Sequence, residues 1–76
     1  MGKQMTKGYP KQVIVAVRDV GGTYMARAAG MGITASCTGS PLVAANRCAN
    51  KVYPKTGWSR ETVARMTYRY SPSIGG

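Results

Sequence analysis

Residues 11–28 read KQVIVAVRDVGGTYMARA, and this stretch decides the fold. Its first part, residues 12–18, alternates between two faces and is rich in β-branched residues, which is typical of a strand. The pair Gly21 and Gly22 then supplies turn chemistry, because glycine readily adopts the positive φ that a tight hairpin requires. Residues 23–28 alternate again. The stretch therefore predicts a hairpin of two antiparallel strands.

A third strand and a helix are predicted after the hairpin. Residues 33–38, ITASCT, have strand composition and follow the turn signals of Gly30 and Gly32. Ser40 and Pro41 mark a helix start, because the serine hydroxyl accepts an otherwise unpaired amide and proline has no amide to leave unpaired. We therefore expect a helix to begin at position 41.

This helix is expected to be amphipathic. Apolar residues recur at the three- and four-residue spacing of one helix face. They are Leu42, Ala45, Cys48, Ala49 and Val52. The helix should end before Pro54, because the residue that precedes a proline is disfavoured in helical geometry. The pattern predicts a helix from 41 to 52 or 53.

The segment that follows the helix supports two interpretations. Residues 59–66, SRETVARM, could open a helix with Ser59 as its cap. Residues 62–70, TVARMTYRY, alternate like a strand, and their Thr and Tyr content favours that structure. We predict a strand over 62–70, and a short helix over 59–66 is the alternative.

These elements describe one small domain. A chain of 76 residues leaves room for a single core. Residues 1–10 predict a flexible basic arm, residues 11–70 an α+β domain, and residues 71–76 a flexible tail. The domain is expected to be a small antiparallel sheet in β-β-β-α-β order, with the amphipathic helix packed on one face. Its core contains no Phe, so a monomer and a homodimer are both open possibilities.

The charge of the chain points to acidic partners. Eleven Lys and Arg residues stand against two acids, Asp19 and Glu61, which gives a formal charge of +9 and a pI near 10.2. Such an excess is the electrostatic signature of a protein that binds DNA, RNA or an acidic protein surface. No apolar stretch is long enough for a membrane span or a signal peptide, so a soluble cytoplasmic protein without a membrane partner is expected.

The same composition argues against catalysis. The chain has no histidine, its two carboxylates lie far apart, and Cys37 and Cys48 are expected to pack in the core as free thiols. We therefore predict that the protein is not an enzyme and uses no cofactor or metal.

Basic residues with aromatic residues among them form the candidate binding site. Residues 51–60 collect three cations and two aromatic side chains in an expected loop, where function concentrates. Trp58 has no periodic core position, which favours a role in binding. A solvated strand face with tyrosines packed on the core is the alternative near the end of the chain. The predicted contact residues are Lys51, Lys55, Trp58, Arg60, Arg65 and Arg69, followed by Arg27 and Arg47. Arg18 would extend the patch, and Lys3, Lys7 and Lys11 would add a mobile electrostatic arm.

Two resemblances to known families add to the predicted fold and binding site. The β-β-β-α order with the helix sequence AANRCANK resembles the second half of a double-stranded RNA-binding domain. That family's first helix is missing, however, and Ser40, Pro41 and Leu42 stand where it carries a lysine cluster. In length and in its lack of catalytic residues the chain resembles small phage-encoded anti-CRISPR proteins, and residues 27–52, RAAGMGITASCTGSPLVAANRCANKV, resemble them in style, as a strand that runs through Gly-Ser-Pro into an alanine-rich helix. The second resemblance implies a protein that binds a CRISPR effector complex in the bacterial host cell.

The leading hypothesis is therefore a phage-type inhibitor. It would bind a host CRISPR effector ribonucleoprotein through a basic surface and would block or misdirect the binding of target DNA. One alternative is a small nucleic-acid-binding module, such as a phage or prophage regulator. Another is a small structural subunit of a larger nucleoprotein particle.

Overall fold

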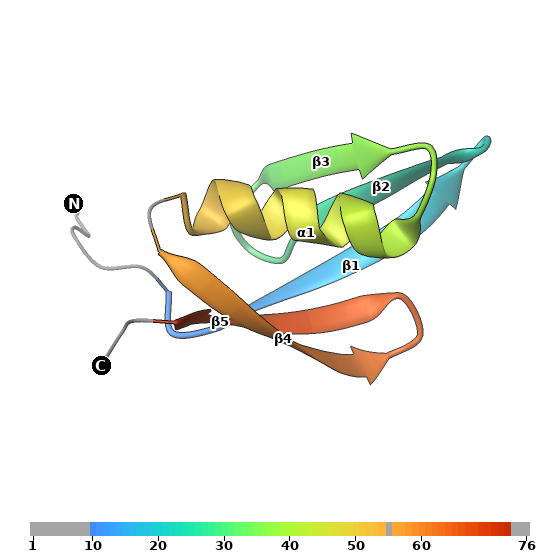
Figure 1. Ribbon diagram of the computed structural model, residues 1–76. Coiled ribbons are helices and arrows are strands. Elements are labelled where there is room, and N and C mark those ends of the chain that lie inside the picture. The colour runs from blue at the N-terminus through green and yellow to red at the C-terminus, as the bar shows by residue number, and fades with distance from the viewer. Residues whose placement is uncertain (1–9, 55, 74–76) are drawn as a thin grey trace.

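A computed structural model describes residues 10–54 and 56–73 of the chain. Its elements are β1 (Val13–Val20), β2 (Thr23–Ala28), β3 (Ile33–Cys37), α1 (Pro41–Val52), β4 (Gly57–Ala64) and β5 (Thr67–Ser73). The strands form one antiparallel sheet in the order β3-β2-β1-β5-β4, and α1 lies along one of its faces (Figure 1). The predicted α+β fold, with three strands, a helix and a further strand region, is confirmed. Most of the predicted basic arm, Lys55 and the end of the predicted tail lie outside the described residues.

The hairpin that opens the sheet forms as its sequence predicts. Val20 pairs with Thr23, and the two residues between them, Gly21 and Gly22, have φ values of 61° and 91°. The amide of Gly22 also donates to Oδ1 of Asp19 at 3.1 Å. Because residues other than glycine rarely adopt positive φ, this glycine pair sets the tight connection and the register of β1 against β2.

The region after the helix differs from its prediction. Instead of one strand over 62–70, the chain forms two strands, β4 and β5, joined by a tight turn, and β5 runs past the expected end to Ser73. The alternative helix over 59–66 is wrong. The turn contains no glycine or proline, and Met66 adopts the left-handed conformation with φ 53°. A register shift between Thr62 and Ala64 also breaks the simple alternation. The sequence pattern therefore runs through the turn without a visible interruption.

The helix begins and ends where the sequence indicates. Oγ of Ser40 accepts a hydrogen bond from the amide of Leu42 at 3.2 Å, and Pro41 occupies the first turn. At the other end the amide of Tyr53 donates to the carbonyl of Ala49 at 2.8 Å. The buried stripe consists of Ala44, Ala45, Cys48, Ala49 and Val52. Its small side chains allow α1 to approach the sheet closely.

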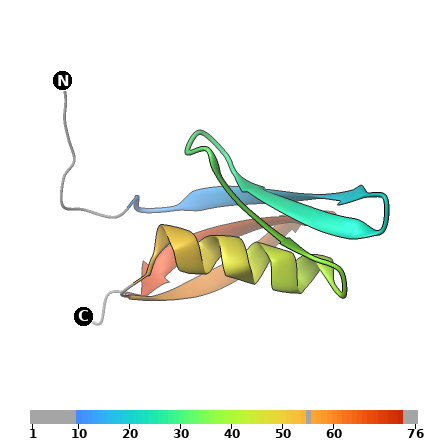
Figure 2. The same cartoon turned by 90° about the horizontal axis from the view of Figure 1, so that it is seen from above.

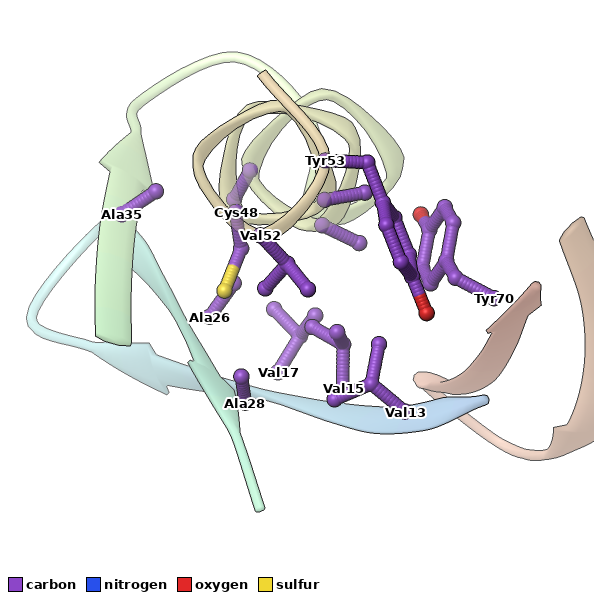
Figure 3. Packing of buried hydrophobic residues seen from close by; sticks show 13 residues of the cluster. Val13, Val15, Val17, Ala26, Ala28, Ala35, Cys48, Val52, Tyr53 and Tyr70 are labelled. Carbon is purple, nitrogen blue, oxygen red and sulfur yellow. The ribbon is translucent and has the colours of Figure 1, made fainter. Parts of the chain in front are cut away.

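The core lies between α1 and a sheet that curves around it (Figure 2). Figure 3 looks along the helix and shows strands on both sides of it and beneath it. Two tyrosines are the largest fully buried side chains, and they stand beside Val13 and Val15. The hydroxyl of Tyr53 donates to the carbonyl of Pro10 at 2.9 Å, and that of Tyr70 donates to Oδ1 of Asn46 at 2.9 Å. Burial raises the pKa of Tyr70 to about 12, because the charged phenolate would lose its hydration.

The sheet face opposite α1 is not covered by any element in the described part of the chain. Because successive side chains of a strand alternate between faces, the neighbours of the buried valines of β1 lie on this outer face. Arg18 on β1, Met25 and Arg27 on β2, and Thr34 on β3 belong to it, and the pairing of the strands brings these residues side by side. We refer to this surface as the outer face.

Candidate functional site

The structure divides the predicted contact residues between several surfaces. Trp58 and Arg60 lie on the inner side of β4, against the flank of α1 that carries Asn46 and Asn50. Arg47 and Lys51 lie on the opposite flank of α1, next to β3. The remaining members occupy the outer face and the turn between β4 and β5. Lys55 lies outside the described residues.

The flank toward β4 and β5, which we call the asparagine flank, is a network of side-chain hydrogen bonds. The indole Nε1 of Trp58 donates to Oδ1 of Asn50 at 2.8 Å, and Nη1 of Arg60 donates to Oδ1 of Asn46 at 3.2 Å. The ring of Trp58 also meets Tyr70 edge to face, with centroids 4.9 Å apart. The expectation that Trp58 has no core position is therefore wrong, because it packs against the core and joins β4 to α1.

Two other predicted residues lie near the turn between β4 and β5. Arg69 projects from β5 and forms an ion pair with Glu61 of β4 on the outer face, which compensates its charge. Arg65 is exposed in the turn itself, and its guanidinium has no hydrogen-bond or ion-pair partner within residues 10–54 and 56–73. The charge of Arg65 is therefore not compensated by a contacting group in the described residues.

The flank toward β3, which we call the basic flank, consists of Arg47 and Lys51. Nη1 of Arg47 donates to the carbonyl of Ser36 at 3.0 Å, and Nζ of Lys51 donates to the carbonyl of Thr34 at 2.7 Å. These carbonyls belong to an edge strand of the sheet. A carbonyl carries no net charge, so these hydrogen bonds orient both cations without neutralising them.

Arg18 and Arg27 carry the positive surface from this edge onto the outer face. Arg27 pairs with Thr34 across β2 and β3, and Arg18 pairs with Met25 across β1 and β2. Neither guanidinium has a hydrogen-bond or ion-pair partner in the part of the chain that the structure describes. The alternation of side chains along β1 and β2 places both arginines on the face away from the buried valines. The sequence pattern alone therefore predicts that Arg18 and Arg27 share one face of the sheet.

Four cations thus surround β3, and we call this set the β3 basic band. It consists of Arg18, Arg27, Arg47 and Lys51. Neither acid of the chain forms an ion pair with the band: Asp19, which follows Arg18 in β1, accepts the amide of Gly22 in the turn, and Glu61 pairs with Arg69 at the other side of the sheet. The band therefore has a strong positive potential that no contacting carboxylate reduces.

A hollow of about 290 Å³ adjoins the band on the outer face. Its walls come from the first three strands and from the end of the turn between β2 and β3. The lining residues are Arg18, Val20, Met25, Ala26, Arg27, Gly32 and Thr34. Most of this surface is apolar, and the two arginines of the band stand at the hollow with unpaired guanidiniums. No pattern in the sequence indicates this hollow, because its walls depend on the pairing of three strands.

The two cysteines differ in environment. Cys48 is buried on α1, where burial raises the pKa of its thiol, and its Sγ donates to the carbonyl of Ile33 at 3.5 Å. Cys37 is half-buried, and the amides of Gly39 and Ser40 lower the pKa of its thiol, with a smaller contribution from Arg47. Both are free thiols. Within the described ranges, no three side chains of the metal-ligating kinds come together.

α1 is the one helix in the described part of the chain, and it lacks the length and hydropathy to cross a membrane. Comparisons with known proteins give no match: no family model, no curated protein and no solved structure is significantly similar to this chain.

Proposed function

We propose that the protein is a non-catalytic module that binds the phosphate backbone of nucleic acid through the β3 basic band. One observation carries the proposal: four neighbouring cations have no contacting carboxylate, and two of them are held in place by neutral carbonyls. Holding cations in place reduces the side-chain entropy lost on binding. A phosphate that approaches the band therefore meets charges that are already positioned and not neutralised.

The chemistry of the band suits phosphate groups. Arginine offers a planar fork of donors that matches two phosphate oxygens, and lysine offers a compact charge with three donors. Neighbouring strands lie about 4.8 Å apart, so a band that crosses β1, β2 and β3 covers roughly 10 Å of backbone before the reach of the side chains is added. A surface of this width contacts more than one phosphate at a time.

The anti-CRISPR inhibitor predicted from the sequence is a second candidate function that uses the same band. In that function, the band contacts nucleic acid or an acidic face of a CRISPR effector ribonucleoprotein, and the protein obstructs target DNA. The charge of +9 supports any acidic partner, whereas the CRISPR assignment rests on the resemblance of residues 27–52 alone. Affinity purification from bacterial lysate separates the two. Protein partners that remain after nuclease treatment favour the inhibitor, and their loss favours direct binding to nucleic acid.

The test of the band compares two variants that lose the same charge. Arg18→Gln/Arg27→Gln removes two members of the band, and Lys11→Gln/Arg65→Gln removes two exposed cations elsewhere. Binding to a fluorescein-labelled 20-nucleotide DNA is followed by anisotropy at several salt concentrations. The first variant should bind at least tenfold more weakly. Its plot of log affinity against log salt should also be flatter by about 1.4 to 1.8, because each lost phosphate contact removes about 0.7 to 0.9 from the slope.

The control variant should lose less than threefold in affinity. Equal losses in the two variants would show that net charge, and not the band, determines binding. No binding of the wild-type protein at 50 mM salt would refute the proposal outright. Urea unfolding of each variant confirms that the substitutions at these exposed positions leave the fold intact.

A further inference from the structure

The hollow beside the β3 basic band has features that phosphate binding does not explain. Val20 is 52% exposed and Met25 is 39% exposed, and both line the hollow together with the two unpaired arginines. A phosphate gains nothing from apolar side chains, and an exposed apolar surface enclosed by charged groups marks a binding site. The ligand of this surface should therefore combine an anionic part with an apolar part.

We infer that the hollow receives one nucleotide of a single-stranded nucleic acid, with its base against Met25 and its flanking phosphates on Arg18 and Arg27. This inference rests on the proposed function and specifies the ligand of the same surface. The nucleotide has the required composition, because its base is flat and largely apolar and its phosphates are anionic.

The register of the strands places the three residues suitably. Arg18 lies directly opposite Met25, and Arg27 is the next residue of β2 on the same face. Arg18 and Arg27 are diagonal neighbours, which lie about 7–8 Å apart in a sheet, so the positions of both arginines adjoin that of Met25. Guanidinium groups can stack on bases in addition to binding phosphates. One base on Met25 therefore brings its neighbouring phosphates within reach of both arginines.

A single strand fits this site better than a duplex. The bases of a duplex are stacked inside it, and one of them enters a hollow only after the cost of extrusion from the stack. In a single strand the bases are free to turn outward. A volume of about 290 Å³ lies at the small end of the range for ligand sites, which suits one nucleotide and not a longer segment.

The aromatic side chains that the structure describes cannot provide another stacking surface on the outer face. Tyr53 and Tyr70 are buried in the core, and the other three pack against it from the side of α1. They are Tyr24, Trp58 and Tyr68. Single-strand binders commonly stack bases on exposed aromatic rings. In this chain the hollow takes that role with a methionine and two arginines.

The experiment compares a mixed-sequence 12-nucleotide DNA with the duplex of the same sequence, both labelled with fluorescein, at 100 mM salt. The single strand should bind the wild-type protein at least fivefold more tightly than the duplex. Met25→Ser should weaken the binding of the single strand about tenfold, which is the typical contribution of one base contact. The same substitution should change the affinity for the duplex less than twofold. Val63→Ser is the matched control, since Val63 is 42% exposed on β4, away from the hollow.

The outcomes separate the two proposals. Duplex binding as tight as single-strand binding, or equal effects of Met25→Ser and Val63→Ser, would overturn the single-strand inference and leave the basic band standing. Absence of binding to both DNAs would overturn the proposed function and the inference with it. Val20→Ser, at the other wall of the hollow, provides a second variant, and circular dichroism checks that each protein is folded.

Discussion

The two flanks of α1 are joined to the sheet by different chemistry. On the asparagine flank, Asn46 and Asn50 accept hydrogen bonds from side chains of β4 and β5. On the basic flank, Arg47 and Lys51 donate to backbone carbonyls of β3. The first flank uses its polar groups to hold the fold together. The second leaves positive charge on the surface, because its acceptors are neutral, and it is the flank that adjoins the candidate site.

The largest effect is expected when Asn46 is removed from the asparagine flank. Asn46→Ala leaves the hydroxyl of Tyr70 without an acceptor, and Tyr70 has no exposed surface. An unsatisfied buried donor costs about 2 kcal/mol, which urea unfolding should detect. Asn50→Ala is the control, because it removes the acceptor of the indole Nε1 of Trp58 from a hydrogen bond that is exposed to solvent. Water can replace the lost amide there, so the free energy of unfolding should fall by only about 0.5 kcal/mol. Equal losses would mean that burial does not distinguish the two contacts.

The next effect concerns alkaline pH. The pKa of Tyr70 is raised to about 12, mainly by burial, against about 10 in the unfolded chain. The neutral phenol therefore stabilises the folded state fully below pH 10, and this contribution is lost as the pH rises from 10 to 12. The free energy of unfolding should fall by something of the order of 2 kcal/mol across this window. In urea unfolding, the free energy of unfolding of Tyr70→Phe should fall less over this pH range than that of the wild type. Lysines titrate in both proteins, so their contribution cancels when the two curves are subtracted. Parallel curves for the two proteins would contradict the assignment to Tyr70.

The smallest effect probes the basic flank through its neighbour Cys37. The pKa of the Cys37 thiol is lowered by the amides of Gly39 and Ser40 and to a lesser extent by Arg47, whereas burial raises the pKa of Cys48. Iodoacetamide at pH 7.5, followed by mass spectrometry, should therefore modify Cys37 well before Cys48. Because the thiolate is the reactive form, Arg47→Gln should slow the reaction of Cys37 about twofold. A rate unchanged by Arg47→Gln would show that the amides alone account for the lowered pKa, and faster modification of Cys48 would contradict the described burial.

Local signals in the sequence predicted the first half of the fold well. The glycine pair determines the turn of the first hairpin, and Ser40 and Pro41 determine the start of α1; each acts through its immediate neighbours. The turn between β4 and β5 lacks such a signal. Met66 takes the left-handed conformation that glycine or asparagine usually provides, and the surrounding structure maintains it, because the carbonyl of Met66 accepts the amide of Val17 at 2.9 Å. The sequence pattern around Met66 does not predict this hydrogen bond to Val17.

The same distinction between local signals and distant contacts applies to the candidate site, of which the sequence predicts only a part. The exposed positions of Arg27, Arg47 and Lys51 follow from the periodicity of β2 and α1, and these residues do come together around β3. The position of Trp58 depends on Asn50 and Tyr70, partners from two other elements, so the pattern of its own segment does not predict it. Side chains whose surroundings are set by one element were placed correctly, and those that depend on several were not.

The position of β5 in the sheet affects the order in which the chain folds. β5 lies between β1 and β4, so the last of the described strands pairs with the first of them, and Val13 lies opposite Tyr70. Until β5 arrives, one edge of β1 is unpaired and the core lacks one of its two buried tyrosines. The entropic cost of closing so long a loop must be met before the contacts between β1 and β5 form. Folding should therefore be a single late event in which the C-terminal hairpin docks beside β1, and a nascent chain that ends before β5 should not form a stable domain.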